Sequence, residues 1–230
     1  MKTLIYGSAS YKIPDKTGVD PDNLDRQTLY AVSLRRLKSV APADTGIVIA
    51  DNTVSGSNEL HPVLRKEVED PRVTRMVWVN SNTVGLKNVG MGEHATFKEA
   101  IRQTQDLIPQ YDWLVYYTSR QVMSFPLLFH YLEKYPNKEA IVGATSHFNV
   151  DGSEDLCAPG NFNDMLFAMK QGTFLRYIDY TDPENNAAKG MNSEQVLYNF
   201  ITEHKVDYQE VYHWGLFRYD YHAAGTMHLT

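Results

Sequence analysis

Apolar residues occur along this chain in short runs that alternate with longer amphipathic stretches. Five runs have the length and the β-branched or aromatic content of buried strands, and they cover residues 2–6, 46–50, 76–79, 113–117 and 140–144. Four stretches with helical spacing separate them, from residue 25 to Pro42, over 58–68, from Gly92 or Glu93 to Pro109, and over 125–135. This alternation predicts an α/β fold with a mostly parallel central sheet and helices on both faces.

The pattern becomes less regular after residue 145. It predicts a loop over residues 147–161, short helices over 163–169 and 173–180, a polar connector over 181–190, a helix capped by Asn192 or Ser193, and a last strand over 207–211. The tail that follows is aromatic and rich in histidine. We expect one domain over residues 1–230, with a regular part (1–145) and a more irregular helical and aromatic part (146–230).

Composition narrows the class of protein. The net charge is −6 with acids and bases interspersed, which argues against a nucleic-acid partner. Cys157 is the only cysteine, so the chain forms no internal disulfide and no multi-thiolate zinc site. No apolar run approaches the roughly 18 residues that span a bilayer, and the N-terminal run is too short for a signal peptide. We expect a soluble, cytoplasmic protein.

Polar and small residues follow the predicted strands. In open α/β sheets, ligands bind outside the carboxyl ends of the strands, so these residues are candidates for substrate binding. Asp51 has a second interpretation, because a short carboxylate after a strand also caps the next turn. The candidates are Gly7, Ser8 and Ser10 after the first strand, Asp51 and Asn52 after the second, Asn82, Gly90, Gly92 and Glu93 after the third, and Thr118, Ser119 and Arg120 after the fourth.

Two segments resemble GT-A glycosyltransferases. The phrase VIADNTVSG is similar to the strand end of their nucleotide-sugar-binding half, where an aspartate holds the base, and NSNTVGLKNVGMGEH resembles their Asn- and Gly-containing loop. The resemblance covers roughly the first 145 residues in the order of elements. It implies a GT-A-like, Rossmann-related fold in which residues 1–145 bind a nucleotide sugar and residues 146–230 bind the acceptor.

The chain departs from that family at the strand over 113–117. Metal-dependent GT-A enzymes place Asp-x-Asp there to hold Mg²⁺ or Mn²⁺, whereas this chain reads Tyr117, Thr118, Ser119, Arg120. The change resembles families from bacterial and viral surface-glycan genes in which a Gly-Arg or Ser-Arg pair stands at this place. The resemblance implies that Arg120 replaces the metal ion at the leaving diphosphate, so no cofactor is assigned and Mg²⁺ or Mn²⁺ stays open. Alternatively, Arg120 pairs with a structural acid such as Glu93, which itself could only cap its helix.

Acidic residues of the second part are candidates for the base that an inverting transfer needs at the acceptor hydroxyl. Asp164 is the first candidate and Glu194 the second, since both resemble acceptor-side acids of GT-A enzymes. Each could instead stabilise the start of a helix. His222 could contact phosphates, while the spacing of His213, His222 and His228 fits no zinc pattern.

The resemblance implies a hexosyl- or pentosyltransferase of polysaccharide biosynthesis that uses a nucleotide-sugar donor and a glycan or other hydroxyl acceptor. A non-catalytic GT-A-like module that binds a nucleotide or glycan remains the alternative. A Rossmann-like nucleotidyltransferase fits less well, because no Gly-x-Gly-x-x-Gly or P-loop follows a predicted strand.

Overall fold

The computed structural model describes residues 1–13, 22–79, 83–85, 87–144, 146–148, 154–156, 161–219 and 227–229. For residues 146–148, 154–156, 217–219 and 227–229 it describes the backbone alone.

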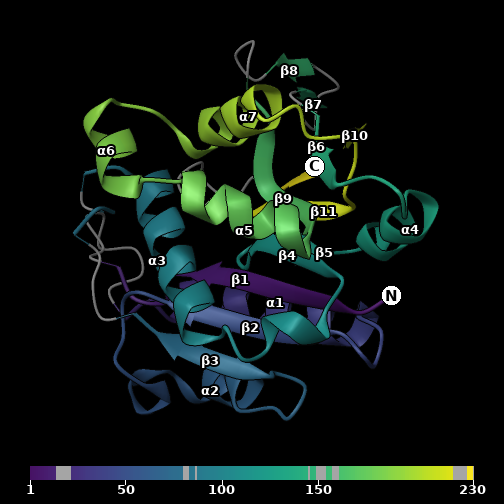
Figure 1. The fold of residues 1–230 in the computed structure, drawn as a ribbon. Coiled ribbons are helices and arrows are strands. Elements are labelled where there is room, and N and C mark those ends of the chain that lie inside the picture. Colours follow the sequence, from purple (N-terminus) through teal and green to yellow (C-terminus); the bar gives the residue numbers. More distant parts are fainter. Residues whose placement is uncertain are drawn as a thin grey trace.

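A seven-stranded sheet forms the centre of the molecule (Figure 1). Its strand order is β10-β6-β9-β4-β1-β2-β3, and every neighbouring pair is parallel except the two that involve β9. The sheet is therefore mostly parallel, as the sequence predicts. The strands are β1 (Thr3–Ala9), β2 (Gly46–Asp51), β3 (Arg75–Trp78), β4 (Trp113–Thr118), β6 (Ala140–Gly143), β9 (Asn163–Lys170) and β10 (Tyr208–Val211).

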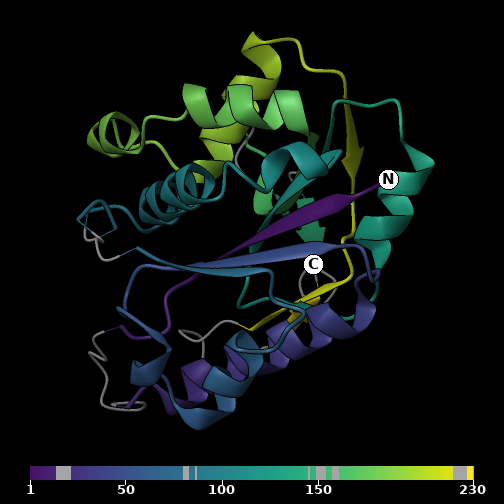
Figure 2. The ribbon, with the colours of Figure 1, turned by 60° about the horizontal axis from the view of Figure 1, so that its bottom comes forward.

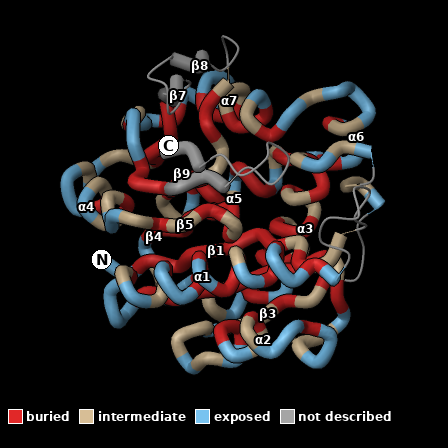
Figure 3. Tube along the Cα trace, turned by 180° about the vertical axis from the view of Figure 1, so that it is seen from behind, coloured by how far each residue is buried: buried red, intermediate tan, exposed pale blue. Residues whose placement is uncertain are grey.

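Helices cover both faces of the sheet (Figure 2). One face packs against α3 (Val89–Gln103), α5 (Gln171–Tyr180) and α7 (Ser193–Glu203). The other packs against α1 (Leu24–Val40), α2 (Pro62–Val68) and α4 (Leu127–Lys134). Figure 3 shows β1 buried between these layers and the outer turns of α1 and α4 exposed. This double cover confirms the predicted fold class and explains why the strands read as continuous apolar runs.

Short elements complete the fold. Two smaller sheets have the strand orders β12-β11-β5 and β7-β8. No helix among the described residues is long and apolar enough to cross a membrane. The remaining elements are β5 (Val122–Met123), β7 (Ser146–Phe148), β8 (Glu154–Leu156), β11 (Leu216–Tyr219), β12 (Met227–Leu229), α6 (Pro183–Ala188) and the 3-10 turns Ser57–Glu59 and Ile108–Gln110.

The predicted helix over residues 163–169 is wrong, because this segment is the strand β9. Its run from Leu166 to Met169 is completely buried, with alternate residues packing against the two opposite helix layers. A short run that is apolar throughout fits a doubly covered strand as well as a buried helix, so periodicity alone does not separate the two. Asp164 therefore lies near the start of a central strand and caps no helix there.

Three further boundaries differ from the prediction. Gly7 and Ser8 lie inside β1 and not in a loop, and the close packing at Gly7 explains the small residue, since a Cβ atom there would lie 2.6 Å from Cδ1 of Ile49. Helix α3 begins at Val89 with Asn88 as its N-cap, so Gly90 and Gly92 are helical. The connector over residues 181–190 contains the short helix α6.

Candidate functional site

The strand order reverses between β1 and β4. Successive crossovers lead from β1 to β2 and then to β3, whereas β4 pairs with the opposite edge of β1. Ligands of open α/β sheets bind in the crevice outside the strand ends at such a reversal. The register places Ser8 of β1 opposite Thr118 of β4 at this point, which brings together two of the predicted site residues.

The hydroxyl group of Tyr116 lies beneath this reversal. It donates a hydrogen bond to Oε2 of Glu93 over 3.0 Å, and it lies 3.2 Å from Oγ of Ser8. A hydrogen bond from the side chain of Thr118 also reaches it. One buried hydroxyl thus connects β1, β4 and α3, and it joins three residues that the sequence singles out.

The N-termini of α3 and α7 meet beside Glu93. The side chain of Asn88, which caps α3, donates from Nδ2 to the carbonyl oxygen of Met191 over 3.0 Å. Gly90 permits the close approach, because a Cβ atom at this position would lie 2.8 Å from Oγ of Ser193. Asn192 caps α7 and puts Glu194 in its first turn. Glu93 lies beyond the first turn of α3, where Asn88 is the cap, so the alternative that Glu93 only caps its helix is wrong. The approach of the two helices brings the predicted residues Glu93 and Glu194 into one region.

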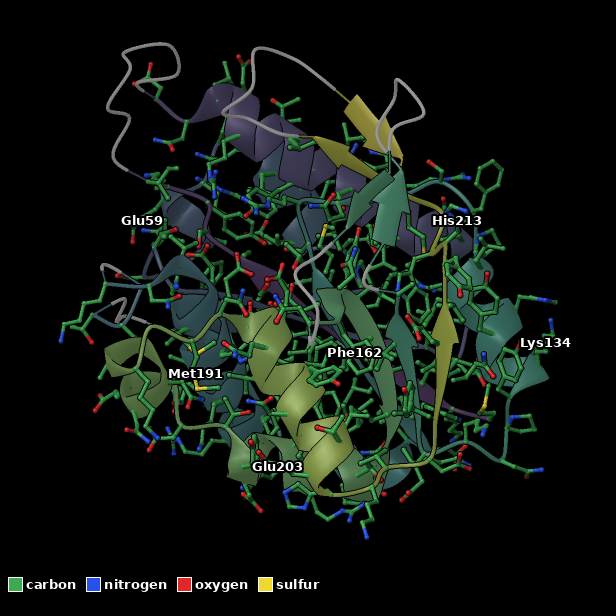
Figure 4. All side chains as sticks on the ribbon, turned by 90° about the horizontal axis from the view of Figure 1, so that it is seen from above. Glu59, Lys134, Phe162, Met191, Glu203 and His213 are labelled. Atoms are coloured by element: carbon green, nitrogen blue, oxygen red, sulfur yellow. The ribbon has the colours of Figure 1, made fainter. Side chains whose placement is uncertain are left out.

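Asp164 joins this group from β9. Asp164 is the second residue of β9, and Glu194 is the second residue of α7. Figure 4 labels Phe162 and Met191, which lie just before these two elements in the chain. The side chain of Ser193 hydrogen-bonds to Asp164. Burial raises the pKa of Asp164 to about 7, the negative charges of Glu194 and Glu93 add to the rise, and the hydrogen bond from Ser193 opposes it. The result is a carboxyl group that changes its charge near neutral pH.

An irregularity in β9 affects which side of the sheet its first residues face. The pairing of β9 with β6 shifts register between Ile141 and Gly143. Phe167 and Met169 pack with α3, α5 and α7, and strict alternation would put Met165 on the same side, yet Met165 packs with the opposite layer. The charge of Asp164 instead acts on Tyr116 and Tyr177, both on the α3 and α5 side. A register shift of this kind can re-aim the side chains at the end of a strand.

Asp51 is held within the protein. Its carboxylate accepts hydrogen bonds from the backbone amides of Tyr11, Thr53 and Val54 over 2.7 to 2.8 Å, and from the hydroxyl of Thr53. The residue is 0% exposed. This geometry favours the capping interpretation of Asp51, since its carboxylate fastens the loop after β1 to the turn after β2. A contact with a nucleobase stays a prediction.

Ser10 and Asn52 are likewise bonded to each other. Ser10 donates from Oγ to Oδ1 of Asn52 over 2.9 Å, and Nδ2 of Asn52 donates to Oγ1 of Thr96 over the same distance. Thr96 in turn donates to the carbonyl of Gly92. This chain of hydrogen bonds ties the ends of β1 and β2 to α3 and positions the wall of the site.

The turn after β4 carries no donor set for a divalent cation. Thr118 and Ser119 offer hydroxyl groups that are nearly buried, the hydroxyl of Ser119 donates to the carbonyl of Ser8, and Arg120 supplies a cation. Hard divalent ions prefer carboxylate oxygens, so these three residues do not fit the Mg²⁺ or Mn²⁺ that metal-dependent GT-A enzymes hold at the corresponding place. Nor is any group of three His, Cys, Asp or Glu side chains in the described part of the chain arranged to hold a metal ion.

The remaining candidates lie in the turn after β4, in the C-terminal part, or outside the described residues. Asn82 and His222 lie outside the described residues, and His228 is described by its backbone alone. Arg120 is half-buried in the turn that follows β4, and His213 is exposed after β10. The roles predicted for these residues stay predictions.

Sequence reasoning missed Tyr116 and Ser193 as members of the site. Tyr116 belongs to an unbroken apolar strand, and its neighbour Tyr117 reads the same. The only available signal is its position two residues before the strand end, which does not reveal the partner of its hydroxyl. Ser193 is recognisable as a helix start, but its approach to Asp164 depends on tertiary packing.

A separate groove of about 720 Å³ runs between α3, α5 and α6. Its charged lining residues include Lys98, Arg102 and Asp182, and none of the predicted site residues lines it. The groove is therefore distinct from the group around Asp164.

Comparison with known proteins supports the architecture. The sequence matches no protein-family model and no curated protein. A protein from Desulfovibrio desulfuricans G20, described as a nucleotide-diphospho-sugar transferase, is similar with a TM-score of 0.51 and 14% identity over 91% of this chain and 79% of that chain. The apo form of mouse xyloside xylosyltransferase 1 gives a TM-score of 0.47 and 10% identity over 92% and 85%. The first of these similarities shows that the chain shares the α/β fold of that protein, and an identity this low speaks for the fold alone.

Proposed function

We propose that the chain is a glycosyltransferase that moves a sugar from a nucleotide-sugar donor to a hydroxyl group of a glycan or similar acceptor. The observation that carries the proposal is the place of Asp164, a carboxyl group with a pKa of about 7 beside Glu93 and Glu194 at the reversal between β1 and β4. A general base works best when its pKa lies near the working pH. The GT-A-like fold supports the donor class.

In the proposed reaction, ionised Asp164 takes the proton of the acceptor hydroxyl. The acceptor oxygen forms a bond to the anomeric carbon while the bond from that carbon to the diphosphate oxygen breaks, and the nucleoside diphosphate leaves with the electron pair. Arg120 follows the strand that ends at this reversal, and its permanent charge suits a diphosphate. Glu194 acts on the base through its charge, a different role from the one predicted for it.

A donor panel tests this function. The protein is incubated with uridine, guanosine and cytidine diphosphate sugars, and release of the nucleoside diphosphate is measured. We expect release with one donor class and a loss of about 10²- to 10⁴-fold in Asp164→Asn, the range by which a positioned base accelerates proton transfer. Asp179→Asn, an exposed acid of α5, is the matched control and should keep full activity.

The outcomes separate the two candidate functions. Release that is lost in Asp164→Asn at an unchanged melting temperature supports the enzyme. A thermal shift with a nucleotide sugar but no release from any donor supports a binding module instead. Neither a shift nor release across the panel contradicts nucleotide-sugar binding at this site.

A further inference from the structure

Two adjacent tyrosines of β4 have hydroxyl groups in opposite surroundings. Tyr116 packs with α3, α5 and α7, and Tyr117 packs with α1 and α4; both are 0% exposed. The hydroxyl of Tyr117 bonds to neutral groups, namely Oγ of Ser33 at 2.8 Å and the carbonyl of Gln121. The hydroxyl of Tyr116 bonds to the carboxylate of Glu93. Of the two tyrosines, only Tyr116 thus bonds to a member of the acidic group, by which we mean Glu93, Asp164 and Glu194.

The direction of the hydrogen bonds follows from the proton count. A tyrosine hydroxyl donates one hydrogen bond, and Tyr116 donates it to Oε2 of Glu93. Its contact with Ser8 at 3.2 Å is therefore one in which Ser8 donates. Burial and the charges of Glu93 and Asp164 raise the pKa of Tyr116 well above its usual value of 10.0, so the hydroxyl keeps its proton and stays a donor to Glu93.

The ring of Tyr116 is held firmly. It stacks on Phe167 of β9 with the ring centres 5.1 Å apart, and it meets Phe97 of α3 edge to face at 4.8 Å. The hydroxyl therefore has a fixed position with respect to α3, which carries Glu93, and to β9, which carries Asp164. Such a ring gives a hydrogen-bond donor little freedom to follow a moving partner.

We propose that Tyr116 is a positioning residue, whose hydroxyl fixes the carboxylate of Glu93 near Asp164 and thereby keeps the negative charge of Glu93 where it opposes the ionisation of Asp164. A donor to a carboxylate favours its charged form, and a charged neighbour disfavours the charge of a second carboxylate. The titratable groups that interact electrostatically with Asp164 are Glu93 of α3, Tyr116 of β4, Tyr177 of α5 and Glu194 of α7. His94 of α3 contacts the rings of Tyr116 and Tyr177. His94 stays neutral, because burial lowers its pKa to about 4. The effect of Tyr116 on the pKa of Asp164 is independent of the proposed function; its consequence for catalysis rests on the proposed function.

Carboxyl carbon-13 NMR of the free protein tests the proposal without any substrate. The resonance of Asp164 is assigned by its absence in Asp164→Asn and is followed from pH 4 to pH 9. We expect Glu93→Gln and Tyr116→Phe each to lower the pKa of Asp164 by ~0.5 to 1. The double variant should lower it no further than Glu93→Gln, because Tyr116 acts through Glu93.

Tyr117→Phe is the matched control, since it removes a buried hydroxyl from the same strand without touching the acidic group, and it should leave the pKa of Asp164 unchanged. Ser8→Ala serves if Tyr116→Phe does not fold. It removes one of the two donors to the Tyr116 hydroxyl and should change the pKa of Asp164 in the same direction as Tyr116→Phe, by less. An unchanged pKa in a folded Tyr116→Phe overturns the proposal, as does a further decrease in the double variant.

The pH dependence of nucleoside diphosphate release distinguishes this proposal from the proposed function. If the protein is a transferase, the acidic limb of the rate profile should move with the NMR value in each variant. If the pKa of Asp164 changes in the variants as expected but no transferase activity is found, the proposed function is contradicted and the positioning role of Tyr116 is supported. If the pKa of Asp164 changes in a variant but the acidic limb of its rate profile does not move, the assignment of Asp164 as the base is contradicted.

Discussion

Asp51 and Asp164 both lie at the edge of the sheet where the parallel strands β1, β2 and β4 end, yet their surroundings are opposite. Asp51 meets three backbone amides and a hydroxyl, all donors. Asp164 has one hydrogen bond from the side chain of Ser193, and the negative charges of Glu194 and Glu93 act on it. Burial raises the pKa of both, but donors oppose the rise at Asp51 whereas acids reinforce it at Asp164. A carboxylate surrounded by donors stabilises a fold, while one surrounded by acids is ready to exchange a proton.

The largest expected effect is on stability at Asp51. Asp51→Ala leaves buried amides without an acceptor, and we expect a loss of about 3 to 5 kcal/mol in the free energy of unfolding, measured by urea denaturation at pH 7. The exposed Asp179→Ala should change it by less than about 0.5 kcal/mol. A loss below about 1 kcal/mol at Asp51 would break the comparison and return Asp51 to the ligand-binding candidates.

The pH dependence of stability should show the opposite behaviour of Asp164. Its pKa is raised from 3.8 to about 7 in the folded protein, so the folded state binds more protons than the unfolded state between these values. The free energy of unfolding should fall as pH rises from about 4 to 7 and then level off, with a contribution of up to about 4 kcal/mol. Asp164→Asn should remove this slope and be at least as stable as the unchanged protein at pH 8. A slope that persists in the variant would locate the titrating group elsewhere.

A smaller effect is expected from Glu194. Its charge contributes more than that of Glu93 to the raised pKa of Asp164. Glu194→Gln should therefore lower the pKa of Asp164 by ~1, and by more than Glu93→Gln does, as followed by NMR titration. Glu184→Gln, on the exposed start of α6, should have no effect. An equal or reversed order of the two variants would mean that charge does not explain the difference between Asp51 and Asp164.

The smallest expected effect is that of chelation. A divalent cation bound among the acids would lower the pKa of Asp164, which would remove its contrast with Asp51. We expect EDTA to change neither that pKa nor the thermal shift given by a nucleotide sugar, since Arg120 supplies the positive charge in the proposed mechanism. Loss of donor binding with EDTA, restored by Mg²⁺ or Mn²⁺, would contradict metal independence.

The sequence by itself determined the class of the fold. Continuous apolar runs separated by amphipathic stretches leave few arrangements other than a doubly covered, mostly parallel sheet, because only such a sheet buries both faces of a strand. It also indicated that polar residues near Ser8, Glu93 and Thr118 would meet, since the carboxyl ends of parallel strands lie at one edge. Asp164 and Glu194 were recognisable as acids near element starts.

Only the tertiary structure decided what those residues touch. The run around Leu166 fits a strand or a helix, and its insertion as an antiparallel strand between β4 and β6 depends on contacts far apart in the sequence. The same pairing brings Asp164 within electrostatic reach of Glu93 on α3 and of Glu194 in the first turn of α7. Tyr116 and Tyr117 are adjacent residues of the same type, yet they pack in different helix layers, because successive residues of a strand face opposite sides of a sheet. A local pattern specifies which face a residue occupies relative to its neighbour, but the partner on that face comes from packing.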